Sequence, residues 1–228
     1  DNLSNMQADL VRTLSFDNDF DIINLDLFKL LENYDESVVN NFNEKIYYLS
    51  HLIDQWIKSN KIGFGDGWHS YTTSLRIRNW VWIFRIFPEL KNSNRLESLW
   101  IQLCWLNKHP EICHGGNHWL ENLIAQIIVS LQFDNNYAEV IYIDSIKKLK
   151  KELKSQILLD GGHEERSAAY HILILDRLVE LGWIMQIVRN ERPTWILNSI
   201  KKMTQWLSLI RISNGKIPLF NDSSSDLC

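Results

Sequence analysis

Reactive side chains are concentrated in residues 160–178, DGGHEERSAAYHILILDRL, where a Gly-containing loop runs into an apolar helical pattern. A plain helix start needs only a capping residue and an acid in its first turn. This segment instead carries carboxylates, a guanidinium, a phenol and two imidazoles: Glu164, Glu165, Arg166, Tyr170, His163 and His171. Such groups bind anions and move protons. We therefore predict part of a functional site at this helix start.

Two earlier loops, GFGDGWHS at 63–70 and CHGGNH at 113–118, also place glycines and polar residues before an apolar helix. The three loops recur at intervals of roughly 45–50 residues, the spacing of repeated helical hairpins. Trp68 and Trp119 are candidates for stacking on a sugar ring. The candidate residues in the two earlier loops and the turns after them are Trp68, His69, Tyr71, Arg76, Asn117, His118, Trp119 and Glu121.

Helical periodicity dominates the chain, and the alternation typical of β-strands is scarce. Helices that are apolar on nearly all sides alternate with helices that have one polar face, which indicates an inner and an outer layer. The predicted fold is all-α, with antiparallel helical hairpins in two layers. The helices are predicted at 36–60, 69–87, 93–108, 117–133, 138–158, 166–190 and 193–212, with one more near 24–33.

Antiparallel hairpins would bring all Gly-containing loops to one end, where the inner helices begin. Each helix N-terminus carries unpaired N–H groups and about half a positive charge. Such an end can attract an anion even though the chain has a formal net charge of −4. We expect the candidate residues to gather there.

Composition excludes several function classes. The formal net charge of −4 gives no support for nucleic-acid binding, and no apolar run is long enough to span a membrane. Three cysteines without a CxxC motif form neither a disulfide framework nor a zinc ribbon. His114, His118 and Glu121 suggest zinc, but His114 precedes two glycines, off the helix that carries His118. No metal and no cofactor is predicted.

Four blocks resemble successive blocks of the heparinase II/III family: YTTSLRIRNWVWIF, GGNHWLENLIAQIIVSLQF, DGGHEERSAAYHILILDRLVEL and PLFNDSSSD. The resemblance covers roughly residues 36–226, in the family's order and spacing. These bacterial polysaccharide lyases combine an N-terminal incomplete (α/α) toroid with a C-terminal β-sandwich domain. The resemblance implies a lead-in segment at 1–35, a toroid domain at 36–228, and a β-sandwich of the same protein as its partner.

The resemblance also implies roles for individual residues. Asn117 and His118 match an Asn-His pair that neutralises a uronate carboxylate, and Glu121 matches an acid that some members place three residues later. Tyr170 matches the tyrosine that protonates the leaving oxygen and can also act as the base. The implied substrate is an acidic, uronate-containing polysaccharide. A further His would come from the sandwich. The family suggests the periplasm or cell surface, while the sequence itself leaves the compartment open.

Uronate β-elimination needs a group that stabilises charge on the carboxylate, a base for the C5 proton, and an acid for the departing O4. An amide with an imidazolium suits the first need. A tyrosine suits the others if its pKa falls from about 10 towards neutrality. Arg166, four residues before Tyr170, is expected one helical turn away, where it would favour the phenolate. His163 and His171 are candidates for relaying protons.

The same residues also have structural interpretations. Asn117 is a good N-cap, and Glu121 and the acids at 164–165 favour helix starts. Tyr170 and His171 can simply pack in a helical core. Lysines on the predicted helix 138–158 are most simply a solvated face.

Two other function classes remain open. The first is a glycoside hydrolase, in which Glu121 with Glu164 or Glu165 would serve as acid and base. The second is a non-catalytic glycan-binding or assembly module that keeps the fold. Products separate the three classes, because a lyase makes an unsaturated sugar, a hydrolase makes only reducing ends, and a binding module makes neither.

Overall fold

The computed structural model describes residues 36–112, 116–211, 217–219, 221 and 223. Over these residues it has seven α-helices, two short 3₁₀ helices and no strand, only an isolated antiparallel bridge between Ile157 and His163. The predicted all-α fold is confirmed. The predicted helix near 24–33 and the lead-in segment lie outside the described residues. The helices are α3 Glu36–Ser59, α4 Ser70–Ile86, α5 Ser93–Lys108, α6 Gly116–Ser130, α7 Asn136–Gln156, α8 Ala168–Arg189 and α9 Thr194–Ile210, with η2 Asp66–Trp68 and η3 Pro88–Leu90.

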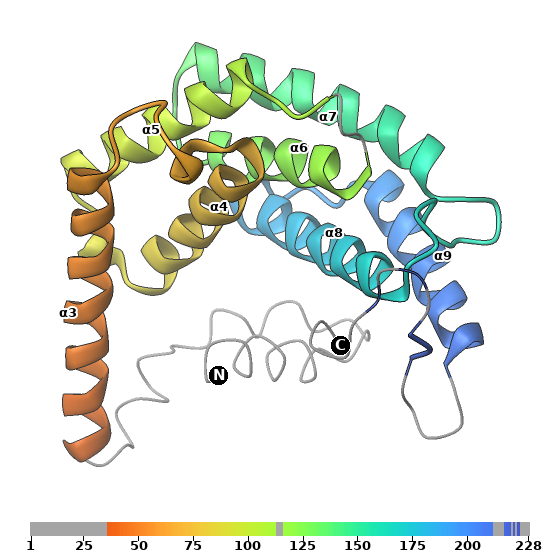
Figure 1. Cartoon of the computed structure of the whole chain (residues 1–228), viewed down its shortest axis with the longest axis horizontal. Coiled ribbons are helices and arrows are strands. Elements are labelled where there is room, and N and C mark those ends of the chain that lie inside the picture. The colour runs from red at the N-terminus through yellow and green to blue at the C-terminus, as the bar shows by residue number, and fades with distance from the viewer. Residues whose placement is uncertain (1–35, 113–115, 212–216, 220, 222, 224–228) are drawn as a thin grey trace. The chain divides into compact units, whose positions relative to one another are not determined.

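Contacts divide the chain into two units, Asp1–Tyr48 and Leu49–Cys228, with the boundary inside α3. The second unit holds every helix from α4 onward. In it α6 lies between α4 and α8, and these three form an inner layer (Figure 1). Helices α5, α7 and α9 pack on α4, α6 and α8 from outside. This is the predicted arrangement of helical hairpins in two layers.

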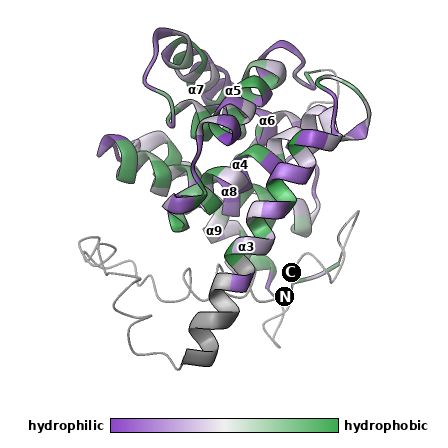
Figure 2. Cartoon of the chain, turned by 90° about the vertical axis from the view of Figure 1, so that its left-hand side faces the viewer, coloured by the Kyte–Doolittle hydropathy of each residue, from purple (hydrophilic) through white to green (hydrophobic). Residues whose placement is uncertain are grey.

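The two layers follow from the residues that each helix carries. Almost every side chain of α6 is buried, and Leu120, Leu123 and Ile127 have no exposed surface. Burying each such side chain contributes roughly 1.5–3 kcal/mol. Outer helix α7 instead buries one stripe and turns its lysines towards solvent, as predicted. Figure 2 shows this mixture of hydrophobic and hydrophilic residues along the outer helices.

Side-chain caps set where several helices begin. Asn135 Oδ1 accepts a hydrogen bond from Ala138 N at 2.9 Å, so α7 starts two residues before its predicted start. Ser167 Oγ accepts one from Tyr170 N at 3.3 Å, so α8 starts two residues after its predicted start.

The later start of α8 corrects the prediction for Arg166. Its φ of 53° is left-handed, so it ends the loop before α8 and is not one helical turn from Tyr170. Arg166 is exposed and lies outside the helix, so the one-turn spacing that would let it stabilise a Tyr170 phenolate does not apply. Its carbonyl oxygen accepts a hydrogen bond from Asn221 Nδ2 at 2.6 Å.

Candidate functional site

The first turns of α4 and α6 lie side by side. The Tyr71 ring stacks on the His118 ring with centroids 4.1 Å apart and planes 17° apart. Glu111, from the loop between α5 and α6, joins the same group. Its Oε1 lies 3.2 Å from His118 Nδ1 and 3.5 Å from His69 Nε2. Two of the predicted loops therefore converge through direct side-chain contacts.

The loop before α8 joins this group through Glu165. Asn117 N donates a hydrogen bond to Glu165 Oε1 at 2.7 Å, which ties the start of α6 to that loop. Burial raises the pKa of Tyr71, and the nearby charges of Glu121 and Tyr170 raise it further. Tyr170 follows that loop in the first turn of α8, five residues after Glu165. We call Tyr71, Asn117, His118 and Tyr170 the helix-start site.

Two polar groups of the helix-start site are not used by the fold. The side-chain amide of Asn117 and the hydroxyl of Tyr170 make no hydrogen bond with any other residue that the structure describes. Tyr170 is partly exposed, and Asn117 is 9% exposed. A polar group left unpaired at the surface of a packed protein is positioned to bind water or a ligand.

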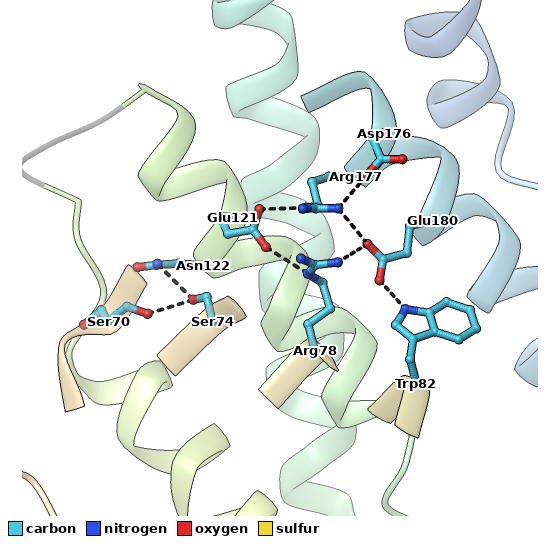
Figure 3. Close-up of polar contacts among 9 residues, drawn as sticks. All are labelled: Ser70, Ser74, Arg78, Trp82, Glu121, Asn122, Asp176, Arg177 and Glu180. Carbon is cyan, nitrogen blue, oxygen red and sulfur yellow. Dashed lines mark hydrogen bonds and ion pairs between the residues drawn. The ribbon is translucent and has the colours of Figure 1, made fainter. Parts of the chain in front are cut away.

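Glu111 is a site residue that the sequence analysis missed. It is only 8% exposed, and its Oε2 accepts a hydrogen bond from Asn122 Nδ2 at 3.4 Å. Glu111 N donates to Asn122 Oδ1 at 2.9 Å. Asn122 Nδ2 also donates to Ser74 Oγ at 3.1 Å, and Ser74 in turn to the carbonyl of Ser70 at 2.9 Å (Figure 3). One carboxylate therefore orients two imidazoles and is itself fixed to α4 and α6.

A second polar group lies further along the same three inner helices (Figure 3). Glu121 of α6 points between two arginines, with Oε1 3.0 Å from Arg78 Nε and Oε2 3.1 Å from Arg177 Nε. Glu180 Oε2 lies 2.5 Å from Arg78 Nη1 and 3.5 Å from Arg177 Nη1. Trp82 Nε1 donates to the other oxygen of Glu180. We call Arg78, Glu121, Arg177 and Glu180 the charged cluster.

Burial and pairing oppose each other in the charged cluster. Burial acts to lower the pKa of Arg78, but Glu180 and Glu121 together raise it above its ordinary value. Burial raises the pKa of Glu180, against the opposing pull of the two arginines. Glu121 has no exposed surface, and both its oxygens are occupied. It can act on a bound substrate only through the arginines that hold it, and it bridges α4 to α8.

Two of the predicted site histidines, His163 and His171, are buried. Burial lowers the pKa of His163 and of His171 to about 4, so both rings are neutral at pH 7. His163 Nδ1 accepts a hydrogen bond from Glu165 N at 3.4 Å. His171 Nε2 lies 3.0 Å from Met203 O, and its ring packs on Trp206. This burial argues for supports of the loop and of α8 rather than for proton relays.

Three other predicted residues, Arg76, Trp68 and Trp119, are half-buried or buried in the helical layers. Arg76 lies 3.8 Å over the Trp56 ring and donates to Gln102 Oε1 at 2.7 Å; burial lowers its pKa to about 10. Trp68 and Trp119 are 4% and 5% exposed. A sugar stacks on an exposed ring face, so this burial argues for a core role. Glu164 and His69 are exposed.

No group of three or more His, Cys, Asp or Glu residues in the described part of the chain is arranged to hold a metal ion. His114, considered above for zinc, lies outside those residues. None of the described helices is long and apolar enough to cross a membrane.

Comparison with models of protein families identifies one family. A family model described as the heparinase II/III N-terminus matches residues 32–227. A comparison with curated protein sequences finds no significant match.

Solved structures show where similar folds occur. The structure of Heparinase III matches with a TM-score of 0.63 and 22% identity, over 75% of this chain and 28% of that one. The heparan sulfate lyase HepC from Pedobacter heparinus matches with a TM-score of 0.56 and 19% identity, over 78% of this chain and 30% of that one. At these identities the likeness concerns the fold, and it supports the predicted (α/α) toroid. The chain spans less than a third of the length of either protein.

Proposed function

This chain belongs to the heparinase II/III N-terminal family, and on that premise we propose that it forms the helical part of a polysaccharide lyase. The lyase would cleave an acidic, uronate-containing polysaccharide by β-elimination. The observation that carries the proposal is the start of α6, where the Asn117 amide has no partner in the described structure, the neighbouring His118 ring stacks on Tyr71, and Glu165 ties in the loop that leads to Tyr170. One neighbour of similar fold is named a heparan sulfate lyase, which makes a glycosaminoglycan the first substrate to test.

Asn117 and His118 would bind the uronate carboxylate. As the C5 proton leaves, negative charge grows on that carboxylate, and preorganised N–H donors stabilise it more than the ground state. The Asn117 side-chain amide has no hydrogen-bond partner in the described structure, so binding a carboxylate breaks no hydrogen bond within the described chain. His118 is held by Glu111 on one edge and by Tyr71 on one face, so its ring is oriented before substrate arrives.

Tyr170 would move the proton. Its phenolate oxygen takes the proton from C5, the C–H electron pair forms the C4=C5 double bond, and the C4–O4 bond breaks. The departing O4 takes the proton back from the Tyr170 hydroxyl. One residue can do both steps on a uronate whose C5 proton and O4 lie on the same face of the ring, because both are then within reach of one side chain. Tyr71 stays protonated, because burial raises its pKa, and serves as the stacking partner of His118.

Glu121 would contribute indirectly. In the charged cluster it fixes α6 between Arg78 and Arg177, and so fixes the helix that carries Asn117 and His118. The same placement counts against the hydrolase alternative, in which Glu121 would have to reach the glycosidic oxygen. The predicted β-sandwich domain, acting as the second wall of the cleft, is part of this proposal.

The test uses the full-length protein incubated with heparan sulfate, heparin and alginate. Ultraviolet absorbance follows the unsaturated uronate, and a parallel assay counts reducing ends. Absorbance that rises in step with reducing ends supports the lyase. Reducing ends without absorbance would indicate the hydrolase instead. Binding without either product would indicate a glycan-binding module.

A further inference from the structure

A carboxylate from the loop before α8 caps the start of α6. Glu165 Oε1 accepts the hydrogen bond of Asn117 N at 2.7 Å. Helix N-termini attract negative charge, so this contact is favourable both as a hydrogen bond and as a charge–dipole interaction. The expected anion-binding position at the start of α6 is therefore occupied, at this N–H, by the protein's own side chain.

Gly116 is shaped to receive Glu165. Its φ is 50°, in the left-handed region that glycine adopts without strain. A Cβ added at this position would overlap Glu165 Oε1 and would lie 3.2 Å from Cδ. The carboxylate thus lies directly against the backbone of the first residue of α6, and any side chain at 116 would push it away.

Glu165 is itself held in place from behind. Its N–H donates to His163 Nδ1 at 3.4 Å, and His163 Nε2 lies 3.2 Å from Gln156 Oε1. Glu164 N donates to the carbonyl of Gln156 at 2.8 Å. Because His163 is neutral, its Nδ1 can accept the Glu165 hydrogen bond. The loop is therefore anchored to the end of α7.

The same loop leads directly to Tyr170, whose backbone N–H is capped by Ser167. Glu165 thus connects the backbone that carries the Asn117 amide to the segment that carries the Tyr170 hydroxyl. We propose that Glu165 is a positioning residue for the elimination, setting the distance between these two groups without touching the substrate. This inference rests on the proposed function, and it gives Glu165 a task that differs from an acid or base.

The first test measures turnover in the full-length protein on the polysaccharide that it cleaves. Glu165→Ala should lower kcat by about 10-fold or more, because small displacements of reacting groups are costly, with a smaller change in KM. Glu165→Gln keeps an acceptor oxygen and should recover most of the loss. Glu97→Ala, at an exposed carboxylate of α5, is the matched control and should leave kcat unchanged. An Ala variant with wild-type kcat would overturn the positioning role.

Gly116→Ala approaches the same contact from the other side. Its Cβ should displace Glu165 and lower kcat, and adding Glu165→Ala should then cause little further loss. Losses that multiply in the double variant would show that the two residues act separately, which would also overturn the proposal.

A second readout separates this inference from the proposed function. Hydrogen exchange at the Asn117 amide should be about 10-fold faster or more in Glu165→Ala, while exchange at Ile127, near the other end of α6, stays unchanged. If the wild-type protein makes no unsaturated product, the proposed function fails, and this measurement still tests the contact. Unchanged exchange at Asn117 would overturn the contact itself.

Discussion

The helix-start site and the charged cluster are built on the same three inner helices, but they treat polar groups in opposite ways. In the charged cluster, both oxygens of Glu121 and the guanidinium of Arg78 have partners within 3.1 Å. In the helix-start site, the Asn117 amide and the Tyr170 hydroxyl have none in the described part of the chain. Polar groups that satisfy one another hold helices together, whereas polar groups left unpaired at a surface are available to a ligand.

Substitutions in the two regions should therefore have different effects on stability and on turnover. Buried charges lose hydration on folding, and their mutual attraction offsets that cost only while every partner is present. Removing one partner leaves the others buried and unpaired. Removing an unpaired surface group leaves nothing behind it unsatisfied. Substitutions in the charged cluster should therefore mainly lower the free energy of unfolding. Substitutions in the helix-start site should mainly lower turnover.

The largest expected effect is at the centre of the charged cluster. Glu121→Ala removes one of the two carboxylates that Arg78 and Arg177 share, the one with no exposed surface, and should lower the free energy of unfolding by about 3–5 kcal/mol. Denaturant unfolding measures the change. Asp176→Ala is the control, because Asp176 pairs with Arg177 at a position where its side chain is 54% exposed, and about 1 kcal/mol or less is expected. Equal losses in the two variants would show that the buried charged cluster contributes no more to stability than an exposed ion pair.

The next effect concerns pH and the buried support of the helix-start site. The pKa of His163 is about 4 in the folded chain against an ordinary value of 6.5, so the unfolded chain binds more protons between these values. The free energy of unfolding should therefore be highest above pH 6.5 and should fall as the pH drops through 4. The contribution of His163 to this fall is on the order of 3 kcal/mol. His171 acts in the same direction.

Thermal unfolding between pH 7 and pH 4 measures this dependence. His163→Gln should flatten it, since the amide cannot take up a proton. The same change at the exposed His51 is the control and should leave the dependence as it is in the wild-type protein. A His163→Gln protein that loses stability as steeply on acidification would show that His163 is not responsible.

The smallest effect on stability should come from the helix-start site. Asn117 bonds Glu165 through its backbone N–H, so Asn117→Ala should change the free energy of unfolding by only about 0.5 kcal/mol. Turnover of the full-length protein should nevertheless fall about 100-fold, because a donor to the developing charge is lost. A loss of stability as large as that of Glu121→Ala would place Asn117 among the structural residues.

Much of the fold could be predicted from the sequence because helical periodicity is a local property. The apolar residues of α6 and the lysines of α7 are enough to place these helices in the inner and outer layers. Each described helix begins within two residues of its predicted start. The remaining errors come from caps, such as Ser167, whose side-chain hydrogen bond puts Arg166 outside α8.

The candidate site was less predictable because its contacts join distant segments. Glu111 has no motif or periodicity of its own, and only the packing of two loops brings His69 and His118 to it. Spacing along α6 likewise placed Glu121 near His118, but gave no sign of the arginines from α4 and α8 that surround it. The catalytic roles of Asn117, His118, Glu121 and Tyr170 stay predictions.

Turnover of the Tyr170→Phe variant of the full-length protein shows whether the Tyr170 hydroxyl moves the proton in the elimination. The change keeps the ring and removes a hydroxyl that makes no hydrogen bond with another described residue, so the variant should unfold like the wild-type protein. Formation of the unsaturated product, followed by ultraviolet absorbance, should fall about 100-fold or more. A stable Tyr170→Phe protein that makes this product at the wild-type rate would contradict this proton-transfer role.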